Sequence, residues 1–392
     1  MATAPRSAVI TGYGLVSPLG DSAQAFWEGL LSGRSATAPI RRFHAGDLTP
    51  ATAAEVPGEV ADADRAGAFA LRAAADALAA AALRSGALDP SRIGVVLGTT
   101  LGGMELFERW DAAAAAGVPP DADLRRVPYF APAARVAEAV GARGPVATTQ
   151  LACASGTAAV ALATDWVRRG RADVALAGGT DLLCRFVVAG FNALRATASV
   201  ARPFDRDRQG LVLGEGAAVL IVEDAAHAAR RGATSGARIL GSGAAADGVH
   251  MTAPDREGGG VVRALGAALA QAGIAPSAVD FVSAHGTGTA FNDAMEARAL
   301  VRVFGERSVP VNGIKGAIGH TLGAAGAFEA VLCVEALARG VLPPTAGLRA
   351  LDPACAGLDL VRDEPRSHDV RVALSTSSGF AGANAALVLG RP

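Results

Sequence analysis

The chain has 392 residues, of which 51% are hydrophobic and 19% charged, and its formal net charge at pH 7 is −1. This length can bury a large core, whereas the near-neutral charge argues against nucleic-acid or membrane-surface binding. No apolar run reaches the length of a membrane span. The four cysteines form no CxxC pair and no metal-ligand spacing, and seven residues precede the first strand pattern. We therefore expect a reduced, cytoplasmic protein without metal, membrane segment or secretory leader.

Along the chain, short apolar runs alternate with alanine-rich helical patterns. The runs predict strands over residues 8–12, 93–98, 146–151, 173–177, 217–222, 238–241, 280–283, 309–312, 372–376 and 385–389. Helical spacing predicts long helices over residues 67–84, 155–169, 259–272, 290–304 and 322–338. The runs at 173–177 and 217–222 are continuously apolar, which is typical of strands covered on both faces. The alternation predicts an α/β fold with mostly parallel sheets.

The order of these elements is repeated. In each half a helix leads to a strand, and a second strand enters a loop of small residues followed by a long helix. Both of those helices end in Arg-Gly, at Gly170 and Gly340, where glycine suits the end of a helix. We predict two similar α/β halves, residues 1–230 and 231–392, that form one layered fold.

A cysteine lies between a predicted strand and a predicted helix, in the segment Leu-Ala-Cys153-Ala-Ser-Gly. This arrangement places the side chain at a helix N-terminus, where the backbone N–H groups and the helix dipole favour a thiolate. Its small neighbours suit a tight turn that presents a nucleophile. The alternative is a small buried hydrophobe, the usual role of free cysteine, and we assign that role to Cys184, Cys333 and Cys355.

Two histidines and a lysine are the reactive candidates of the second half. His285 ends a strand and precedes Gly-Thr-Gly-Thr, and His320 precedes the long helix at 322–338. Like Cys153, both follow predicted parallel strands, at the end where α/β folds bind ligands. Lys315 is the single lysine among 36 basic residues, which indicates a need for a compact ammonium that arginine does not supply. A structural histidine is the alternative interpretation for either ring.

Two glycine-containing turns complete the survey. The segment 377–384 lies between two predicted strands, and its backbone N–H groups could complete an oxyanion hole, although an ordinary glycine-rich hairpin is the alternative. The segment 11–17 follows a strand but lacks the third glycine of a dinucleotide loop, so we expect no nucleotide there.

Taken together, these motifs resemble those of the β-ketoacyl-acyl-carrier-protein synthases, the condensing enzymes of the thiolase superfamily, and specifically the elongating type II class. The resemblance runs in order through nearly the whole chain, in segments 12–20, 152–156, 202–216, 284–289, 315–329 and 379–384. It implies a thiolase-like, five-layered αβαβα fold built from two related halves. It also implies a dimer with no cofactor, whose substrates are carried on the phosphopantetheine of an acyl carrier protein.

The resemblance implies roles for the reactive residues. Cys153 would accept an acyl chain, and His285 and His320 would bind the thioester carbonyl of a malonyl unit while CO₂ leaves. The resulting enolate would attack the acyl group on Cys153. The backbone N–H groups of Cys153 and Phe380 would form the oxyanion hole, and Phe380 would also act as a gate.

Supporting roles follow from the same resemblance. Lys315 would orient the histidine site, with Glu329 as a buried member of its network and Asp293 positioning the lysine. Thr287 and Thr289 would hydrogen-bond the phosphopantetheine arm.

The Cys-His-His set implies a ketosynthase catalysing decarboxylative Claisen condensation in type II polyketide or fatty acid biosynthesis. Two alternatives stay open, a non-elongating acyltransferase or hydrolase on the same fold, and a subunit of a ketosynthase–chain-length-factor heterodimer. The expected partners are an acyl carrier protein and either a second copy or a chain-length-factor-like homologue. Candidates for docking the carrier protein are Arg65, Arg202, Arg206 and Arg208.

Some positions depart from the family pattern. Ala253, Ala381 and Ala383 replace polar or glycine residues at the gate and the pantetheine contacts, so those contacts are expected to differ. The segment 191–202 is shorter than in housekeeping fatty-acid synthases. The compact pattern is more similar to condensing enzymes of specialised type II pathways, such as those of aryl polyenes or reduced polyketides.

Overall fold

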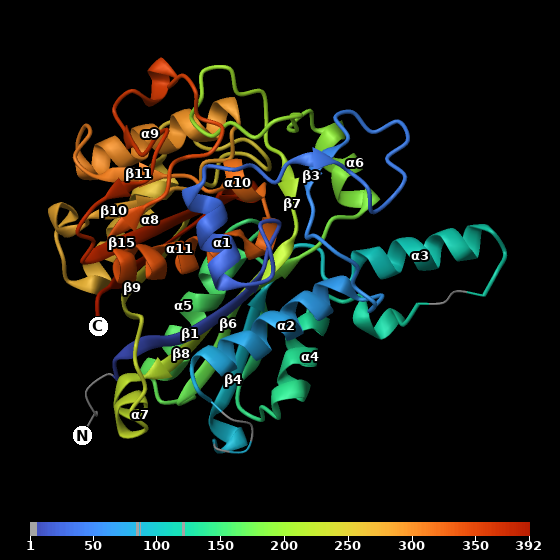
Figure 1. Cartoon of the computed structure of the whole chain (residues 1–392), viewed down its shortest axis with the longest axis horizontal. Helices are drawn as coiled ribbons and strands as arrows, with labels where there is room; N and C mark the ends of the chain where they lie inside the picture. Colours follow the sequence, from blue (N-terminus) through green and yellow to red (C-terminus); the bar gives the residue numbers. More distant parts are fainter. Residues whose placement is uncertain (1–5, 84–85, 87, 120–121) are drawn as a thin grey trace.

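Strands from both halves of the chain join in one mixed sheet (Figure 1). The structure is a computed structural model that describes residues 6–83, 86, 88–119 and 122–392. The first half contributes β1 (Ala8–Val16), β4 (Ile93–Gly98), β5 (Val146–Thr149), β6 (Val174–Asp181) and β8 (Gly216–Asp224). The second half contributes β9 (Ala237–Ala246), β10 (Phe281–Ser283), β11 (Pro310–Asn312), β13 (Asp359–Leu360), β15 (Val372–Gly379) and β16 (Ala383–Gly390).

The helices and short strands complete the element list. The helices are α1 (Ala23–Leu31), α2 (Arg65–Ala80), α3 (Met104–Ala115), α4 (Ala131–Val140), α5 (Ser155–Arg168), α6 (Arg185–Ala193), α7 (Ala225–Arg230), α8 (Gly259–Ala272), α9 (Ala290–Phe304), α10 (Lys315–Ile318) and α11 (Ala325–Arg339). The remaining strands are β2 (Ala38–Pro39), β3 (Thr52–Ala54), β7 (Leu213–Gly214), β12 (Val341–Leu342) and β14 (Arg366–Ser367).

The sheet is not mostly parallel, so that prediction is wrong. Its strand order is β13-β11-β10-β15-β16-β9-β1-β8-β6-β4-β5. Pairing is parallel between β13, β11, β10 and β15 and between β6, β4 and β5, but antiparallel between the strands in the middle of this order. The hairpin that joins β15 to β16 explains part of this, because antiparallel neighbours need only a short turn whereas parallel neighbours need a long crossover. The two halves meet where residues 8–10 of β1 pair with 237–239 of β9.

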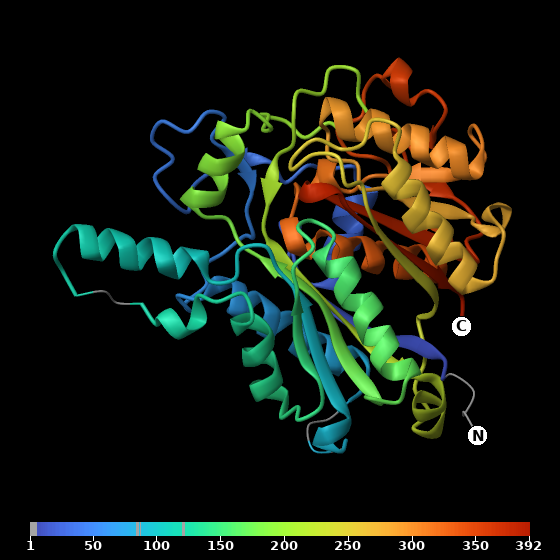
Figure 2. The same cartoon turned by 180° about the vertical axis from the view of Figure 1, so that it is seen from behind.

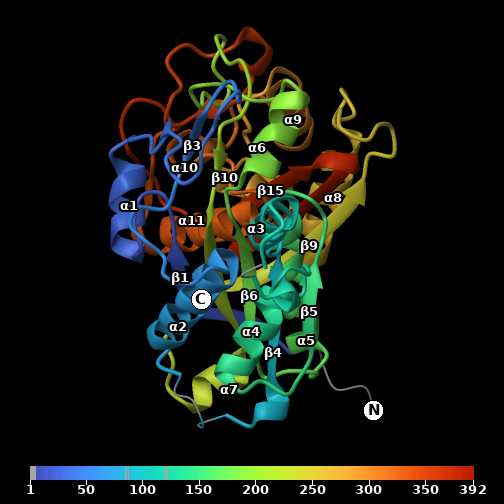
Figure 3. The same cartoon turned by 90° about the vertical axis from the view of Figure 1, so that its right-hand side faces the viewer.

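Helices cover the sheet in the predicted five layers. Helices α2 and α4 pack on the outer face of the first half, and α8, with α9 against it, packs on the outer face of the second half. Helices α5 and α11 contact each other and strands of both halves, so they form the middle layer. Figure 3 gives a side view of this arrangement, and Figure 2 shows α3 projecting away from the layers.

The middle layer explains why these sequences are so apolar. Nearly every residue of α11 is buried, which is typical of a helix that is apolar on all sides. The largest core joins both halves, since Phe26 and Trp166 belong to the same cluster as Phe281 and Phe328. Strands β6 and β8 are buried along their whole length, as their continuous apolar runs predicted.

Most predicted elements are present, with shifted ends. The strand predicted at 8–12 continues to Val16, and the helix predicted at 322–338 begins at Ala325 after a 3₁₀ turn over residues 322–324. The helix predicted at 67–84 ends at Ala80, and residue 84 lies outside the described residues. None of the helices in the described ranges combines the length and apolar character needed to cross a membrane.

Candidate active site

A sharp turn presents Cys153 directly before helix α5. Ala152 has a positive φ of 47°, an uncommon conformation for a residue with a side chain, and Ala154 is the N-cap of α5. The Ser155 hydroxyl holds the turn, because it donates to the carbonyl of Ala152 at 2.6 Å and accepts from the amide of Leu151 at 2.9 Å. The predicted strand–turn–helix geometry of the cysteine is therefore present.

Burial opposes the thiolate that the helix N-terminus favours, so the resting sulfur is expected to be a thiol. Burial raises the pKa of Cys153 to about 12, and the nearby Lys315 ammonium opposes this only in part. The helix N-terminus favours the thiolate by up to about 2 kcal/mol and so acts against this effect of burial. The proton must consequently leave during the reaction.

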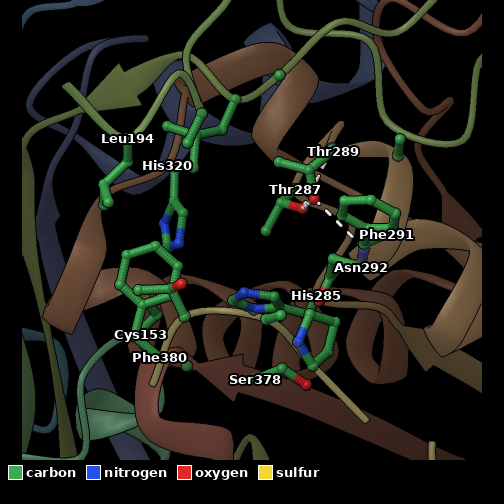
Figure 4. A pocket seen from close by; sticks show the side chains of 18 of the residues that line it. Cys153, Leu194, His285, Thr287, Thr289, Phe291, Asn292, His320, Ser378 and Phe380 are labelled. Atoms are coloured by element: carbon green, nitrogen blue, oxygen red, sulfur yellow. Dashed lines mark hydrogen bonds between the residues drawn. The ribbon is translucent and has the colours of Figure 1, made fainter. Parts of the chain in front are cut away.

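Two imidazoles face each other in the cavity that Cys153 lines. The rings of His285 and His320 are edge to face, with centroids 5.2 Å apart. The cavity has a volume of about 360 Å³, and Cys153, Phe380, Thr287 and both histidines line it. Figure 4 shows Cys153 and Phe380 on one side of it and the threonines on the other. The structure thus brings the three predicted reactive side chains to one place.

The hydrogen bonds of the two rings define their tautomers. Nδ1 of His285 lies 3.2 Å from Nζ of Lys315, and Nδ1 of His320 lies 3.2 Å from the backbone N of Leu322. An ammonium and a backbone amide only donate, so both Nδ1 atoms are acceptors and the proton of each neutral ring is on Nε2.

Both histidines are neutral. Burial, followed by the charge of Lys315, holds the pKa of each well below 6.5, and His320 lowers that of His285 further. Two neutral rings with Nε2–H groups are two hydrogen-bond donors without net charge, which suits the carbonyl oxygen of a thioester.

Lys315 is buried at the centre of a hydrogen-bond network. Besides Nδ1 of His285, its ammonium donates to the carbonyl oxygen of His285 and pairs with Glu329. Glu329 also accepts from the hydroxyl of Ser377 at 3.1 Å, and this hydroxyl lies 2.7 Å from that of Thr157. Burial raises the pKa of Glu329 to about 7 against the opposing effect of the lysine. The retained lysine is therefore a buried ammonium with three hydrogen-bond partners around it.

Asp293 does not position the lysine, so that part of its predicted role is wrong. Its carboxylate accepts from the backbone N of Phe204 at 2.7 Å and of Gly288 at 3.1 Å. It also lies 3.3 Å from the Thr287 hydroxyl and 3.7 Å from Nε of Arg208. Asp293 instead fixes the loop that carries Thr287 and Thr289, whose hydroxyls are 2.9 Å apart and line the cavity.

Two buried carboxylates of the site escaped the sequence prediction. Glu296 accepts from the backbone N of His285 at 2.7 Å, of Gly286 at 2.8 Å and from the Thr376 hydroxyl at 2.6 Å. Asp181, at the end of β6, accepts from the backbone of the loop after β4 and from the backbone N of Gly323 at 2.6 Å. Glu296 left a signal, since it follows Asp293 by about one helical turn, whereas the partners of Asp181 lie far away in the sequence.

The hairpin that carries Phe380 rests on the turn of Cys153. A β-carbon at Gly379 would lie 2.9 Å from the backbone N of Cys153, so only glycine fits this approach. Phe380 stacks on Phe191 with ring centroids 5.5 Å apart. Both rings, with Cys153, also line a second cavity of about 410 Å³. The stacked pair therefore lies between two chambers that share the cysteine.

Two of the four arginines predicted to dock the carrier protein are buried, and their assignment is wrong. Arg65 pairs with Glu215 and with Glu105, and Arg208 pairs with Asp352. Arg206 is exposed and Arg202 partly exposed. A further arginine, Arg195, is exposed and lines the first cavity.

A metal site is also absent from the part of the chain that the structure describes, where no three His, Cys, Asp or Glu side chains are grouped to hold an ion.

Comparisons with known proteins agree with this architecture. Residues 6–228 match the family model of the β-ketoacyl synthase N-terminal domain, and residues 236–349 match that of the C-terminal domain. The chain is 40% identical to a putative polyketide β-ketoacyl synthase 1 of Streptomyces halstedii, over 99% of this chain and 98% of that protein. It is 37% identical to 3-oxoacyl-[acyl-carrier-protein] synthase 2 of Coxiella burnetii, over 98% and 99%.

A solved structure shares the complete fold. The ishigamide ketosynthase/chain length factor superposes with a TM-score of 0.93 at 38% identity, covering 99% of this chain and 100% of that one. Both family models and the full-length relatives lead to the same assignment. The chain belongs to the β-ketoacyl synthase family, the acyltransferases of type II polyketide and fatty acid biosynthesis.

Proposed function

We propose that this site carries out decarboxylative Claisen condensation of an acyl chain on Cys153 with a malonyl thioester. The observation that carries the proposal is the pair of neutral imidazoles, both with Nε2 as the protonated nitrogen, in the cavity that Cys153 lines. Neutral donors can stabilise an enolate oxygen without protonating its carbon.

In the first step, Sγ of Cys153 attacks the carbonyl carbon of the incoming acyl thioester. A new C–S bond forms, the old C–S bond breaks, and the cysteine proton leaves with the departing phosphopantetheine thiol. The backbone N–H groups of Cys153 and Phe380 hold the developing oxyanion, a contribution of about 3–4 kcal/mol per donor. The close contact between Gly379 and Cys153 supports this pairing of amides.

In the second step, the carbonyl oxygen of the malonyl thioester accepts hydrogen bonds from His285 and His320. The bond to the carboxylate breaks, CO₂ leaves, and its electron pair forms the enolate. The enolate carbon then attacks the acyl carbonyl on Cys153, and the sulfur leaves as a thiolate. Lys315 and Glu329 keep the histidines in place, and Lys315 keeps Nδ1 of His285 from taking a proton.

We assign the phosphopantetheine arm to the first cavity. Thr287 and Thr289 lie along it as a hydroxyl pair, and Arg195 adds a positive charge suited to the phosphate. Ala253 lines the same cavity and has no hydroxyl to offer, so the threonines carry more of the recognition. Ala381 takes a positive φ of 61° beside the gate, a position where the family pattern has glycine.

The substrates are proposed to arrive on an acyl carrier protein, with no cofactor required. The relative from Coxiella burnetii is named for that carrier, and the ishigamide relative includes a chain length factor. These names support a homodimer or a heterodimer with such a homologue. Arg202, Arg206 and Arg195 are the proposed docking residues.

The cellular setting and the domain boundary are further proposals. All four cysteines are free and buried, which supports a cytoplasmic location and thereby a reducing compartment. We place the boundary between the halves at residue 230, the end of α7, and the gap between the two family matches supports it. We also propose a specialised type II pathway.

Incubation with acyl-carrier protein and malonyl-carrier protein tests the reaction. Condensation yields a chain two carbons longer, whereas a hydrolase yields free acid and a non-catalytic partner subunit yields neither. Cys153→Ala should form no acyl adduct. His320→Ala should still form the adduct, as seen by mass spectrometry, but release no CO₂. An elongated product from Cys153→Ala would refute the nucleophile assignment.

A further inference from the structure

The walls of the second cavity present few free hydrogen-bond donors. The inference drawn from them rests on the proposed function, because Cys153 lines this cavity. Its volume is about 410 Å³, and it shares Cys153 and the stacked pair Phe191 and Phe380 with the first cavity but not Thr287 and Thr289. An acyl chain on the cysteine that avoids the arm cavity must extend into it. The groups on its walls therefore determine which acyl chains it accepts.

Two threonines line this cavity, but their hydroxyl protons are already committed. The hydroxyls of Thr99 and Thr100 both donate to the carboxylate of Asp181 at 2.8 Å. Asp181 is fully buried, and three backbone amides, those of Thr100, Leu101 and Gly323, also donate to it. A hydroxyl has one proton, so neither threonine has a donor left for a ligand.

The backbone amides of the same wall are committed as well. Those of Thr100 and Leu101 donate to Asp181, and that of Gly102 donates to the Thr99 hydroxyl at 3.0 Å. Asp181 thus draws the donors of this loop away from the cavity. The loop therefore presents only carbon atoms and hydrogen-bond acceptor oxygens to the second cavity.

The other walls offer little more. Side chains of Val187, Phe191 and Leu322 are hydrocarbon, and the amide of Leu322 is bound to Nδ1 of His320. The amide of Leu194 donates to the carbonyl of Gly190. Among the described residues that line this cavity, Gln150 alone carries a side-chain amide, and it lies on an exposed position at the rim.

We propose that the acyl chain held here is reduced, a saturated or conjugated hydrocarbon, and that the site discriminates against poly-β-keto chains. A ketone oxygen needs a donor when it leaves water, and burying it without one is costly. A poly-β-keto chain would place several ketone oxygens against walls whose one free side-chain amide, that of Gln150, lies at an exposed position. A hydrocarbon chain loses no hydrogen bond on entering and gains from burial of its apolar surface.

Three eight-carbon N-acetylcysteamine thioesters test this inference directly. They are octanoyl, 5-oxooctanoyl and 5-methyleneoctanoyl, the last being a steric match to the ketone without its oxygen. The rate of Cys153 acylation is measured by intact-protein mass spectrometry. We expect octanoyl and 5-methyleneoctanoyl to load at similar rates and 5-oxooctanoyl about tenfold more slowly, as for one buried carbonyl without a donor. Equal rates for the ketone and its methylene analogue would overturn the inference and leave the proposed condensation intact. Failure of all three to acylate Cys153 would overturn the proposed function, and this inference with it.

A donor placed in the cavity should abolish the discrimination. Gly190 lines the cavity, and a β-carbon built there meets no atom within 4 Å. Gly190→Asn adds an amide donor, and Gly190→Leu is its matched control of similar shape. We expect the rate ratio of ketone to methylene thioester to rise about tenfold in G190N relative to G190L. The same ratio in both variants would contradict missing donors as the cause.

Discussion

Nζ of Lys315 lies 3.2 Å from Nδ1 of His285, and both groups are buried. Lys315 therefore influences Nε2 of His285 indirectly, because it donates to Nδ1, the ring nitrogen that could otherwise take up a proton. A positioning residue of this kind affects the histidine step and leaves the cysteine step alone.

Lys315→Arg should lose malonyl decarboxylation by at least about 100-fold, because a planar guanidinium cannot replace a compact ammonium with three partners in a closed site. Lys315→Met should fold less stably by about 3–5 kcal/mol, since it leaves the Glu329 carboxylate buried without its cation. Release of CO₂ and thermal unfolding are the measurements. Acylation of Cys153 should persist in Lys315→Arg, and wild-type CO₂ release from it would show that the ammonium has no special role.

Glu296→Gln should weaken the histidine step while keeping acyl loading. The carboxylate holds the amides of His285 and Gly286 together, and an amide side chain has only one oxygen to accept with. We expect a loss of about 1–3 kcal/mol in the free energy of unfolding and at least a tenfold drop in decarboxylation. The exposed Glu257→Gln is the matched control. A variant indistinguishable from that control would remove Glu296 from the site.

The alkylation of Cys153 by iodoacetamide should rise with pH without a plateau. Burial raises the thiol pKa to about 12, so at every pH from 7 to 9 the thiolate is the minor form and its fraction grows about tenfold per pH unit. Mass spectrometry of the modified peptide gives the rate at each pH. A rate that levels off near neutral pH would mean that the helix N-terminus outweighs burial after all.

Arg195→Ala should raise the KM for acyl-carrier protein several-fold and leave acylation by a short thioester without phosphate unchanged. Its side chain is exposed at the mouth of the arm cavity, and among the described residues none forms an ion pair with it. Arg171→Ala is the control, because Arg171 follows the opposite end of α5 from Cys153. A higher KM for both donors would point to the cavity shape instead of the charge.

The sequence predicted the reactive residues better than their support. Cys153 and His285 stand in short motifs that closely follow strands β5 and β10, so the pattern that identifies them also places them, whereas the short helix α10 lies between strand β11 and His320. Asp181 and Glu296 act through amides far from them in the chain, and no local pattern reports such a contact. Arg65 and Arg208 were predicted to be surface charges, because the sequence does not show the distant carboxylates with which they pair in the interior.

The fold was predictable to a similar degree. Hydrophobic periodicity located β4 and α8 at their observed ends, since both are buried on defined faces. It did not give strand direction, because the antiparallel pairing of β1 with β8 and β9 depends on how the chain returns across the sheet. Strand direction is a property of connections, which apolar runs do not encode.

The contact of Gly379 with the turn of Cys153 allows the ring of Phe380 to move independently of its backbone. Because the main chain is pinned at that glycine, the aromatic ring that follows can swing about its own torsions while the peptide behind it stays still. In the proposed reaction, the ring of Phe380 can move to admit a long acyl chain. Its peptide N–H meanwhile stays in position to stabilise the oxyanion. A bulky substrate can therefore displace the Phe380 ring without moving the Phe380 peptide.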